Sequence, residues 1–128
     1  MSRKNLSIAG LGIELIHDSY DRGLTALGEP GEDLLIVFVA PPWGHALSEA
    51  AGLDLRRTEP PVAEVIDVTT VRLGRHKLLF AVQVHETVEP ASLAELAAKF
   101  GWSALKTYDI NEPGRNHGLL LATWGWTP

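Results

Sequence analysis

The chain has 128 residues, of which 45% are hydrophobic and 21% are charged. It is therefore long enough for one globular domain, which we expect over residues 1–128, and too apolar to be disordered. It has no cysteine, which excludes disulfides, thiol catalysis and thiolate metal sites. A net charge of −5 argues against a protein that binds long nucleic acid through its phosphates, although it leaves open the recognition of a single base or a short end.

The first quarter of the chain predicts a helix end, a strand and a loop. Residues 2–11 are weakly periodic and meet glycines at positions 10 and 12, which is typical of the end of a helix. The short apolar run 13–17 predicts a strand, with Asp18 and Ser19 just past its end. Residues 21–33 contain three glycines and a proline, so we expect a loop with room for one helical turn.

A continuous apolar run, LLIVFVA at residues 34–40, predicts a strand covered on both faces. Pro41 and Pro42 follow at once and end the strand, because proline cannot continue a sheet ladder. Trp43 then stands just past the strand end. Exposure of its ring there is costly unless something flat stacks on it, so this position is the first candidate for function.

Two helices and a strand are predicted in the middle of the chain. Residues 61–74 begin with proline, end with glycine and carry one apolar helical face, formed by Val62, Val65, Ile66, Thr69 and Leu73. The apolar run 77–84 predicts a second covered strand. Ser92 and Glu95 have the spacing of a capping box, which predicts a helix that begins at Ser92 and closes at Gly101.

Two further strands end the chain. Residues 103–110 and 117–126 are joined by the turn sequence NEPGRN, and so short a connection makes the pair antiparallel. Trp124 and Trp126 alternate along the last strand and are expected in the core or at an interface. Buried strands that alternate with helices indicate an α/β fold with a mainly parallel sheet, which here closes in a C-terminal antiparallel hairpin.

Such a sheet, with a Pro-Pro-aromatic motif after a central strand, resembles that of the class I S-adenosylmethionine-dependent methyltransferases. APPWG at residues 40–44 is similar to their fourth motif, usually Asp, Asn or Ser followed by Pro-Pro and an aromatic residue. The Pro-Pro-Trp-Gly version resembles trimethylguanosine synthase and the exocyclic-amine methyltransferases. The resemblance implies that Pro41 and Pro42 present a carbonyl to the target amino group, that Trp43 stacks on the base, and that these three are the catalytic residues.

The same resemblance implies S-adenosylmethionine as the cofactor. It places Asp18 at the end of the family's third strand, where an acidic residue contacts the adenine, with Ser19 beside it. Two departures stand against these matches. Ala40 occupies the position of the family's acceptor side chain, and the glycine-rich first motif, which holds the methionine end and the ribose, is absent from the sequence. We therefore expect an incomplete Rossmann-like sheet that lacks the family's first two, cofactor-binding strands.

Two functions follow from the resemblance. The first is that of the C-terminal portion of an S-adenosylmethionine-dependent methyltransferase, which transfers methyl to an amino group of a nucleobase or an RNA end. The alternative is a non-catalytic truncated or remnant domain that does not bind the cofactor alone. In either case the isolated chain is expected to be inactive. A third function, that of a small-molecule-binding α/β domain with a cleft at Trp43, has no specific feature in its favour.

Several other polar residues have two interpretations each. His45 is an acid–base candidate beside the motif, although a cap on the next helix is the favoured interpretation. His85 and Glu86 follow the strand 77–84 at the same edge as Trp43, either as pocket liners or as a plain strand end. The five histidines show no metal-ligand spacing, so no metal site is predicted. A basic cluster is expected at the opposite sheet edge as a solvated helix end, formed by Arg72, Arg75, His76 and Lys77.

The sequence also predicts location and assembly. Arg3 and Lys4 before an apolar run imitate a signal peptide, but Glu14 interrupts that run and no small-residue cleavage site follows. No apolar run approaches the ~20 residues needed to span a bilayer, so we expect a cytoplasmic protein that does not contact membranes. Without the family's first strands, the run 34–40 has an unpaired edge that bears no charge. We therefore expect a homodimer or higher oligomer, with this strand at or near the contact.

Overall fold

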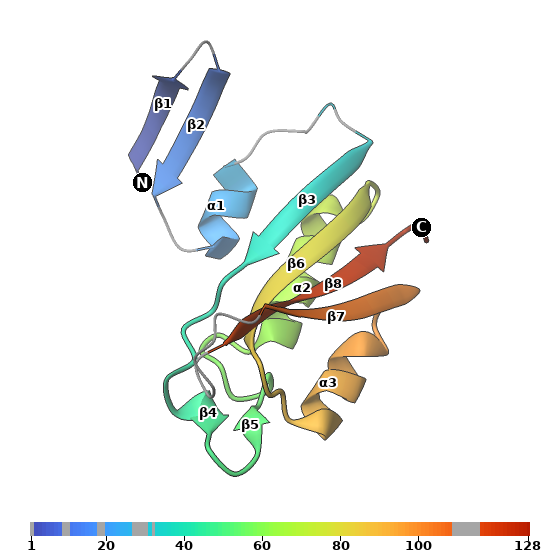
Figure 1. Cartoon of the computed structure of the whole chain (residues 1–128). Helices are drawn as coiled ribbons and strands as arrows, with labels where there is room; N and C mark the ends of the chain where they lie inside the picture. The colour runs from blue at the N-terminus through green and yellow to red at the C-terminus, as the bar shows by residue number, and fades with distance from the viewer. Residues whose placement is uncertain (1, 9–10, 18–19, 27–30, 32, 109–115) are drawn as a thin grey trace. The chain divides into compact units, whose positions relative to one another are not determined.

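The computed structural model describes residues 2–8, 11–17, 20–26, 31, 33–108 and 116–128. The chain divides into two compact units, Met1–Gly31 and Glu32–Pro128. Figure 1 shows the elements of both units.

The first unit contains a β-hairpin and a short helix. β1 (Ser2–Ile8) pairs antiparallel with β2 (Leu11–His17), and α1 covers Tyr20–Ala26. The strand predicted at 13–17 is confirmed and starts two residues earlier, whereas the helix end predicted at 2–11 is wrong. Leu6 and Ile8 lie two residues apart and pair with apolar residues of β2, so the period of the pattern is that of a strand. The loop predicted at 21–33 begins as α1.

The second unit is built on a mixed four-stranded sheet. Its strands are β3 (Leu34–Val39), β6 (Lys77–His85), β8 (His117–Trp124) and β7 (Trp102–Tyr108), in that spatial order. Only β3 and β6 are parallel, because β8 runs antiparallel to both β6 and β7. The α/β class and the closing hairpin are confirmed, but the expectation of a mainly parallel sheet is wrong. The hairpin inserts its second strand beside β6, which creates two antiparallel pairs instead of one.

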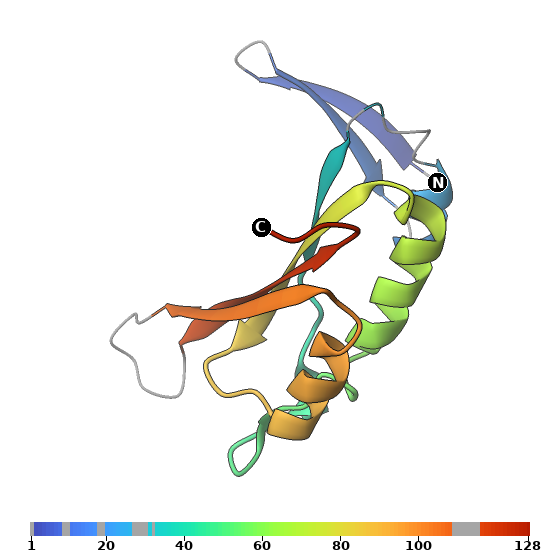
Figure 2. The ribbon, with the colours of Figure 1, turned by 90° about the vertical axis from the view of Figure 1, so that its right-hand side faces the viewer.

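Two helices cover one face of this sheet (Figure 2). α2 (Val62–Leu73) has the predicted bounds and buries four of its five predicted apolar-face residues, while Val65 is half-buried. α3 (Pro90–Ala97) begins earlier and ends earlier than predicted. The capping box is wrong, because Glu89 is the N-cap and accepts hydrogen bonds from the backbone N–H groups of Ala91 and Ser92. The core beneath the helices is aliphatic and aromatic, with Leu78, Phe80, Val82, Val84, Leu120 and Ala122 all buried.

The opposite face of the sheet, which we call the open face, is formed by Leu34, Ile36, Phe38, Leu79, Ala81, Leu119 and Leu121. β3 is an edge strand, and the side chains of Leu34, Ile36 and Phe38 are 44%, 70% and 63% exposed. The expectation that this strand is covered on both faces is therefore wrong. Both α2 and α3 lie on the other face, so only alternate residues of β3 pack against them (Figure 2).

A small subdomain connects β3 to α2. It contains the 3-10 helix η1 (Gly44–Ala46) and the short strands β4 (Leu47–Ser48) and β5 (Gly52–Leu53), which form an antiparallel pair. Leu53 forms a parallel bridge to Val88, in the segment that follows β6. The subdomain is thus attached at the carboxyl end of β6.

Candidate functional site

The Pro-Pro-Trp-Gly sequence lies at the sheet edge where both parallel strands end. β3 ends at Val39, and its register partner Val82 lies three residues before the end of β6. Pro41 and Trp43 are half-buried and Pro42 is exposed. Gly44 has a positive φ of 47° and begins η1, and the carbonyl of Trp43 accepts a hydrogen bond from the Ala46 N–H at 2.8 Å. The predicted motif therefore forms a turn with a fixed backbone.

The Trp43 ring contacts two histidines. Its centroid lies 5.7 Å from that of His85, with the rings perpendicular, and 5.1 Å from that of His117, with the rings tilted by 35°. His85 ends β6 and His117 begins β8, and the two are register partners. The three rings form an aromatic cluster at the end of the open face, and we refer to it as the Trp43 cluster. The Trp43 indole therefore packs against two imidazoles, whereas the sequence predicted an exposed ring on which a base could stack.

His85 is almost fully buried, at 8% exposure. The backbone N–H of Thr87 donates a hydrogen bond to its Nδ1 at 3.1 Å. In the neutral ring this bond fixes the hydrogen on Nε2. The Nδ1 lone pair is therefore occupied by a backbone donor. The ring forms a fixed wall.

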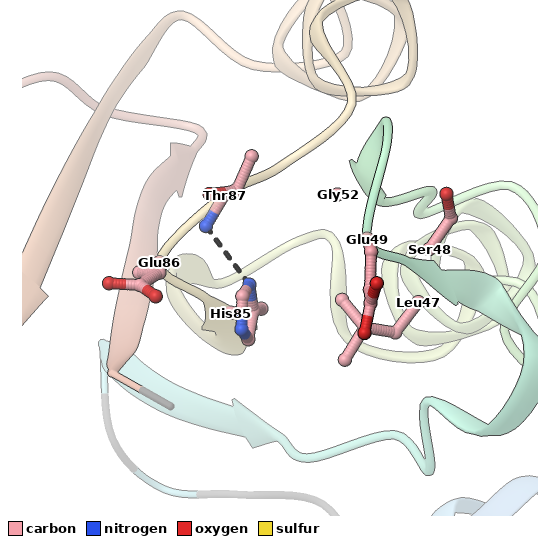
Figure 3. A pocket seen from close by; sticks show the side chains of 7 residues that line it. All are labelled: Leu47, Ser48, Glu49, Gly52, His85, Glu86 and Thr87. Carbon is pink, nitrogen blue, oxygen red and sulfur yellow. Dashed lines mark hydrogen bonds between the residues drawn. The ribbon is translucent and has the colours of Figure 1, made fainter. Parts of the chain in front are cut away.

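A pocket of about 430 Å³ adjoins the cluster through His85 (Figure 3). One wall comes from β4 and β5 and the other from the end of β6, and the lining residues are Leu47, Ser48, Glu49, Gly52, His85, Glu86 and Thr87. The Glu86 carboxylate accepts a hydrogen bond from the Asn116 amide at 2.9 Å, and the Glu86 N–H donates to the Asn116 carbonyl. Glu49 and Glu86 thus both line a pocket next to an aromatic cluster, and the Glu86 carboxylate is turned away from the β4–β5 wall, toward Asn116 (Figure 3). Carboxylates are hydrogen-bond acceptors, so the lining suits a ligand that carries amino groups.

Backbone contacts hold the two walls at a fixed distance. The Leu53 N–H donates to the Thr87 carbonyl at 2.8 Å, and the Glu89 N–H donates to the Leu53 carbonyl at 2.8 Å. Gly52 is buried with a φ of 84°, and a Cβ at this position would lie 2.6 Å from the Thr87 carbonyl oxygen. Only glycine permits this approach, so the width of the pocket depends on Gly52.

An ionic cluster on the protein surface stabilises the contact between β5 and the segment that follows β6. Arg56 contacts Asp54 at 3.0 Å, Glu89 at 3.1 Å and Glu95 at 3.3 Å. The hydrogen bonds from Arg56 hold the pKa of Asp54 below its ordinary value. The pKa of Glu89 is lowered mainly by the N–H groups of Ala91 and Ser92, and less by Arg56. The pKa of Arg56 is raised chiefly by Asp54. The cluster thereby ties β5 to the start of α3.

The other predicted site residues have separate outcomes. Asp18 and Ser19 lie outside the described residues. His45 lies within η1 and does not cap a helix; its exposed Nε2 is 3.8 Å from the Glu59 carboxylate. The basic cluster lies between α2 and the start of β6, at the edge opposite Trp43, as predicted. The two C-terminal tryptophans are half-buried and donate indole N–H groups to backbone carbonyls, which fits a packing role.

Sequence reasoning brought Trp43, His85 and Glu86 to one edge but missed His117, Glu49 and Asn116. His117 was visible as the first residue of the last strand. Its place beside His85 depends on β8 being the neighbour of β6, which no local pattern specifies. Glu49 reaches the pocket only because the β4–β5 hairpin folds back on residue 87.

Compared with known proteins, the chain matches no family model, no curated protein and no solved structure. Within the described ranges, no group of His, Asp and Glu side chains could hold a metal ion. None of the helices in the described part of the chain is long and apolar enough to cross a membrane.

The described residues do not fit the methionine end of S-adenosylmethionine. A nucleotide-type cofactor in an open α/β sheet is held by a glycine-rich turn between a strand and a helix. The two segments that follow the parallel strands, 40–46 and 86–89, contain a single glycine between them, Gly44.

Proposed function

We propose that this chain is the substrate-recognising, C-terminal portion of a class I S-adenosylmethionine-dependent methyltransferase with an incomplete Rossmann-like sheet. Its substrate would be an exocyclic amino group of a nucleobase or an RNA end. The proposal is supported by the Pro-Pro-Trp-Gly turn at the carboxyl end of β3 and by the closing antiparallel hairpin. The observation that carries it is the acceptor-lined pocket that shares His85 with the Trp43 cluster.

The pocket supplies the side-chain hydrogen-bond acceptors that the Pro-Pro-Trp-Gly motif lacks. Ala40 has no acceptor side chain, so the turn alone offers only carbonyl oxygens to an amino group. The carboxylate of Glu49 adds acceptor oxygens in the adjoining pocket. The Glu86 carboxylate binds the Asn116 amide, and this bond fixes the end of β6 that forms the opposite wall. An exocyclic amine would donate to the Glu49 oxygens while the flat ring of the base lies against the Trp43 cluster.

A second candidate, a non-catalytic remnant of such an enzyme, is favoured by the state of Trp43. Its ring is half-buried and contacts two imidazoles, and Ala40 provides no acceptor for a methyl-transfer geometry. Such a remnant would still bind the base but would transfer nothing. The two candidates share the pocket and differ only in the cofactor, so binding and transfer must be measured separately.

Binding is tested by titrating the ¹⁵N-labelled chain with adenosine monophosphate. We expect saturable shifts of the backbone signals of His85, Glu86 and Thr87 and of the Trp43 indole. Trp43→Ala should weaken binding by about tenfold, equivalent to ~1.4 kcal/mol, and leave the melting temperature nearly unchanged. Trp126→Phe is the matched control and should bind like the natural chain. Saturable shifts elsewhere on the sheet, or none at all, would contradict the proposal.

Cofactor binding is tested by calorimetry with S-adenosylmethionine alone. We expect weak binding or none, because the glycine turn that supplies backbone donors is missing. Micromolar binding to this chain would show that the cofactor is held by other residues. That result would remove the second candidate and leave the first.

A further inference from the structure

The free edge of β3 presents a defined set of backbone groups. The Lys77 N–H donates to the Asp33 carbonyl at 2.9 Å, so the backbone of residue 33 points toward β6. Backbone groups alternate sides along a strand, and the N–H and C=O groups of Leu34, Ile36 and Phe38 therefore point away from β6. Within the described part of the sheet, β3 has no neighbour on that side.

The side chains of the same three residues belong to the open face and are exposed. Charged side chains and prolines usually prevent edge strands from pairing. Leu34–Val39 contains neither, and it contains no glycine. The edge therefore combines three outward donors, three outward acceptors and an apolar surface on the same residues.

We propose that the occupant of this edge is a second copy of the chain, whose β3 pairs antiparallel with the first about a two-fold axis. Opposite residues of an antiparallel pair share one face, so the two open faces become continuous only if residues of equal parity pair. The centred solution places Ile36 opposite the partner's Ile36 and Leu34 opposite the partner's Phe38. All outward N–H and C=O groups of these residues then form hydrogen bonds between the two copies. The side chains that lie opposite one another are apolar, so no charges are brought together.

The size of the contact sets its strength. A buried aromatic side chain covers roughly 150–250 Å², so the exposed fractions of these three side chains offer on the order of 300 Å² of apolar surface per copy. Stable complexes bury about 800 Å² per partner. The pair is therefore a weak dimer whose population depends on concentration.

Sedimentation velocity of the whole chain over a dilution series tests the dimer. We expect a shift from monomer to dimer as concentration rises, abolished by Ile36→Lys. Val71→Lys is the matched control, because Val71 is an apolar residue of α2 that is 89% exposed, and it should dimerise like the natural chain. A monomer at all concentrations, as expected if another part of the same chain covered the edge, would overturn the proposal. A dimer unaffected by Ile36→Lys would overturn it as well.

Single-cysteine variants test the register, since the chain has no cysteine of its own. In the proposed register the two Ile36 Cα atoms lie about 5.5 Å apart, within the range that a disulfide spans. Ile36→Cys should therefore form a disulfide-linked dimer under mild oxidation. Phe38 is 63% exposed, against 70% for Ile36, but in this register it lies four residues from its copy, so Phe38→Cys should remain reduced at the same concentration. Equal cross-linking of the two variants would contradict this register.

Discussion

The two faces of the main sheet are built from the same strands but differ in almost every other respect. The face beneath α2 and α3 is aliphatic and aromatic, and Leu78, Phe80 and Val84 are fully buried on it. The open face carries exposed apolar residues along β3 and, at its end, the polar rings of the Trp43 cluster. A single step along β6, from Val84 to His85, crosses from one to the other. The buried core and the candidate site are thus separated by the alternation of one strand.

The sharpest test of this separation compares two phenylalanines. Phe80 is fully buried and packs on Phe100 with centroids 5.5 Å apart, so Phe80→Ala should lower the free energy of unfolding by about 3–5 kcal/mol. Phe38 is 63% exposed, and Phe38→Ala should lower it by less than about 1 kcal/mol. Urea denaturation at a concentration where the chain is monomeric measures both. Similar losses for the two variants would show that the open face is covered within one chain.

Gly52 tests the junction between the pocket and the covered core. Gly52→Ala must strain a φ of 84° and displace the Thr87 carbonyl, so we expect a loss of more than about 1 kcal/mol, together with loss of nucleotide binding. Gly31→Ala is the control, because nothing lies within 4 Å of a Cβ at that position. Thermal melts and the adenosine monophosphate titration provide the two readouts. A Gly52→Ala variant that is stable and binds normally would show that nucleotide binding does not depend on this pocket.

Thr123 does not follow this division into a buried face and an open face. Its register places it on the open face, opposite Leu79 and Trp102, yet it is fully buried and its hydroxyl has no hydrogen-bond partner among the described residues. Thr123→Val replaces the hydroxyl with a methyl of similar shape. We expect a gain of about 1 kcal/mol in the free energy of unfolding, because an unsatisfied buried polar group is removed. A loss of stability would indicate a partner for the hydroxyl.

The smallest expected effect is the dependence of stability on pH. The pKa values of Asp54 and Glu89 are lowered in the folded chain, so the stabilisation they provide is complete above their unfolded pKa values and is lost as pH falls through the lowered ones. We expect the free energy of unfolding to fall between about pH 5 and pH 3. The loss should be smaller in Arg56→Met than in the natural chain, while Lys106→Met should behave like the natural chain. The effect is small because exposed ion pairs contribute little to stability.

The sequence predicts those parts of the fold that depend on neighbours along the chain. α2 is bounded by Pro61 and Gly74, and its apolar period of 3.6 identifies the buried face. The hairpin of β7 and β8 follows from its short connection. Local patterns fail where two choices have similar local energies. In α3, Glu89 competes with Ser92 for the cap, and Ser92 instead accepts a hydrogen bond from the distant Leu55 N–H.

The candidate site likewise contains residues whose proximity local patterns predict and residues whose proximity they do not. Trp43 and His85 follow two predicted strands, and parallel strands end at one edge, so their proximity was predictable. His117 joins them because β8 lies next to β6, and Glu49 joins them because the β4–β5 hairpin bonds to Thr87. Both depend on pairings between segments that are far apart in the sequence. No pattern within either segment specifies its partner.

The central claim is that the pocket beside the Trp43 cluster selects a base by its exocyclic amine. Adenosine monophosphate and purine riboside monophosphate differ only at C6, which carries an amino group in the first and a hydrogen in the second, so the ratio of their dissociation constants measures the selection. We expect the natural chain to prefer adenosine monophosphate by about tenfold, equivalent to ~1.4 kcal/mol. Glu49→Gln should remove the preference, whereas Glu64→Gln, in the exposed first turn of α2, should keep it. Equal affinities for the two nucleotides in the natural chain, or a preference that survives Glu49→Gln, would contradict the account.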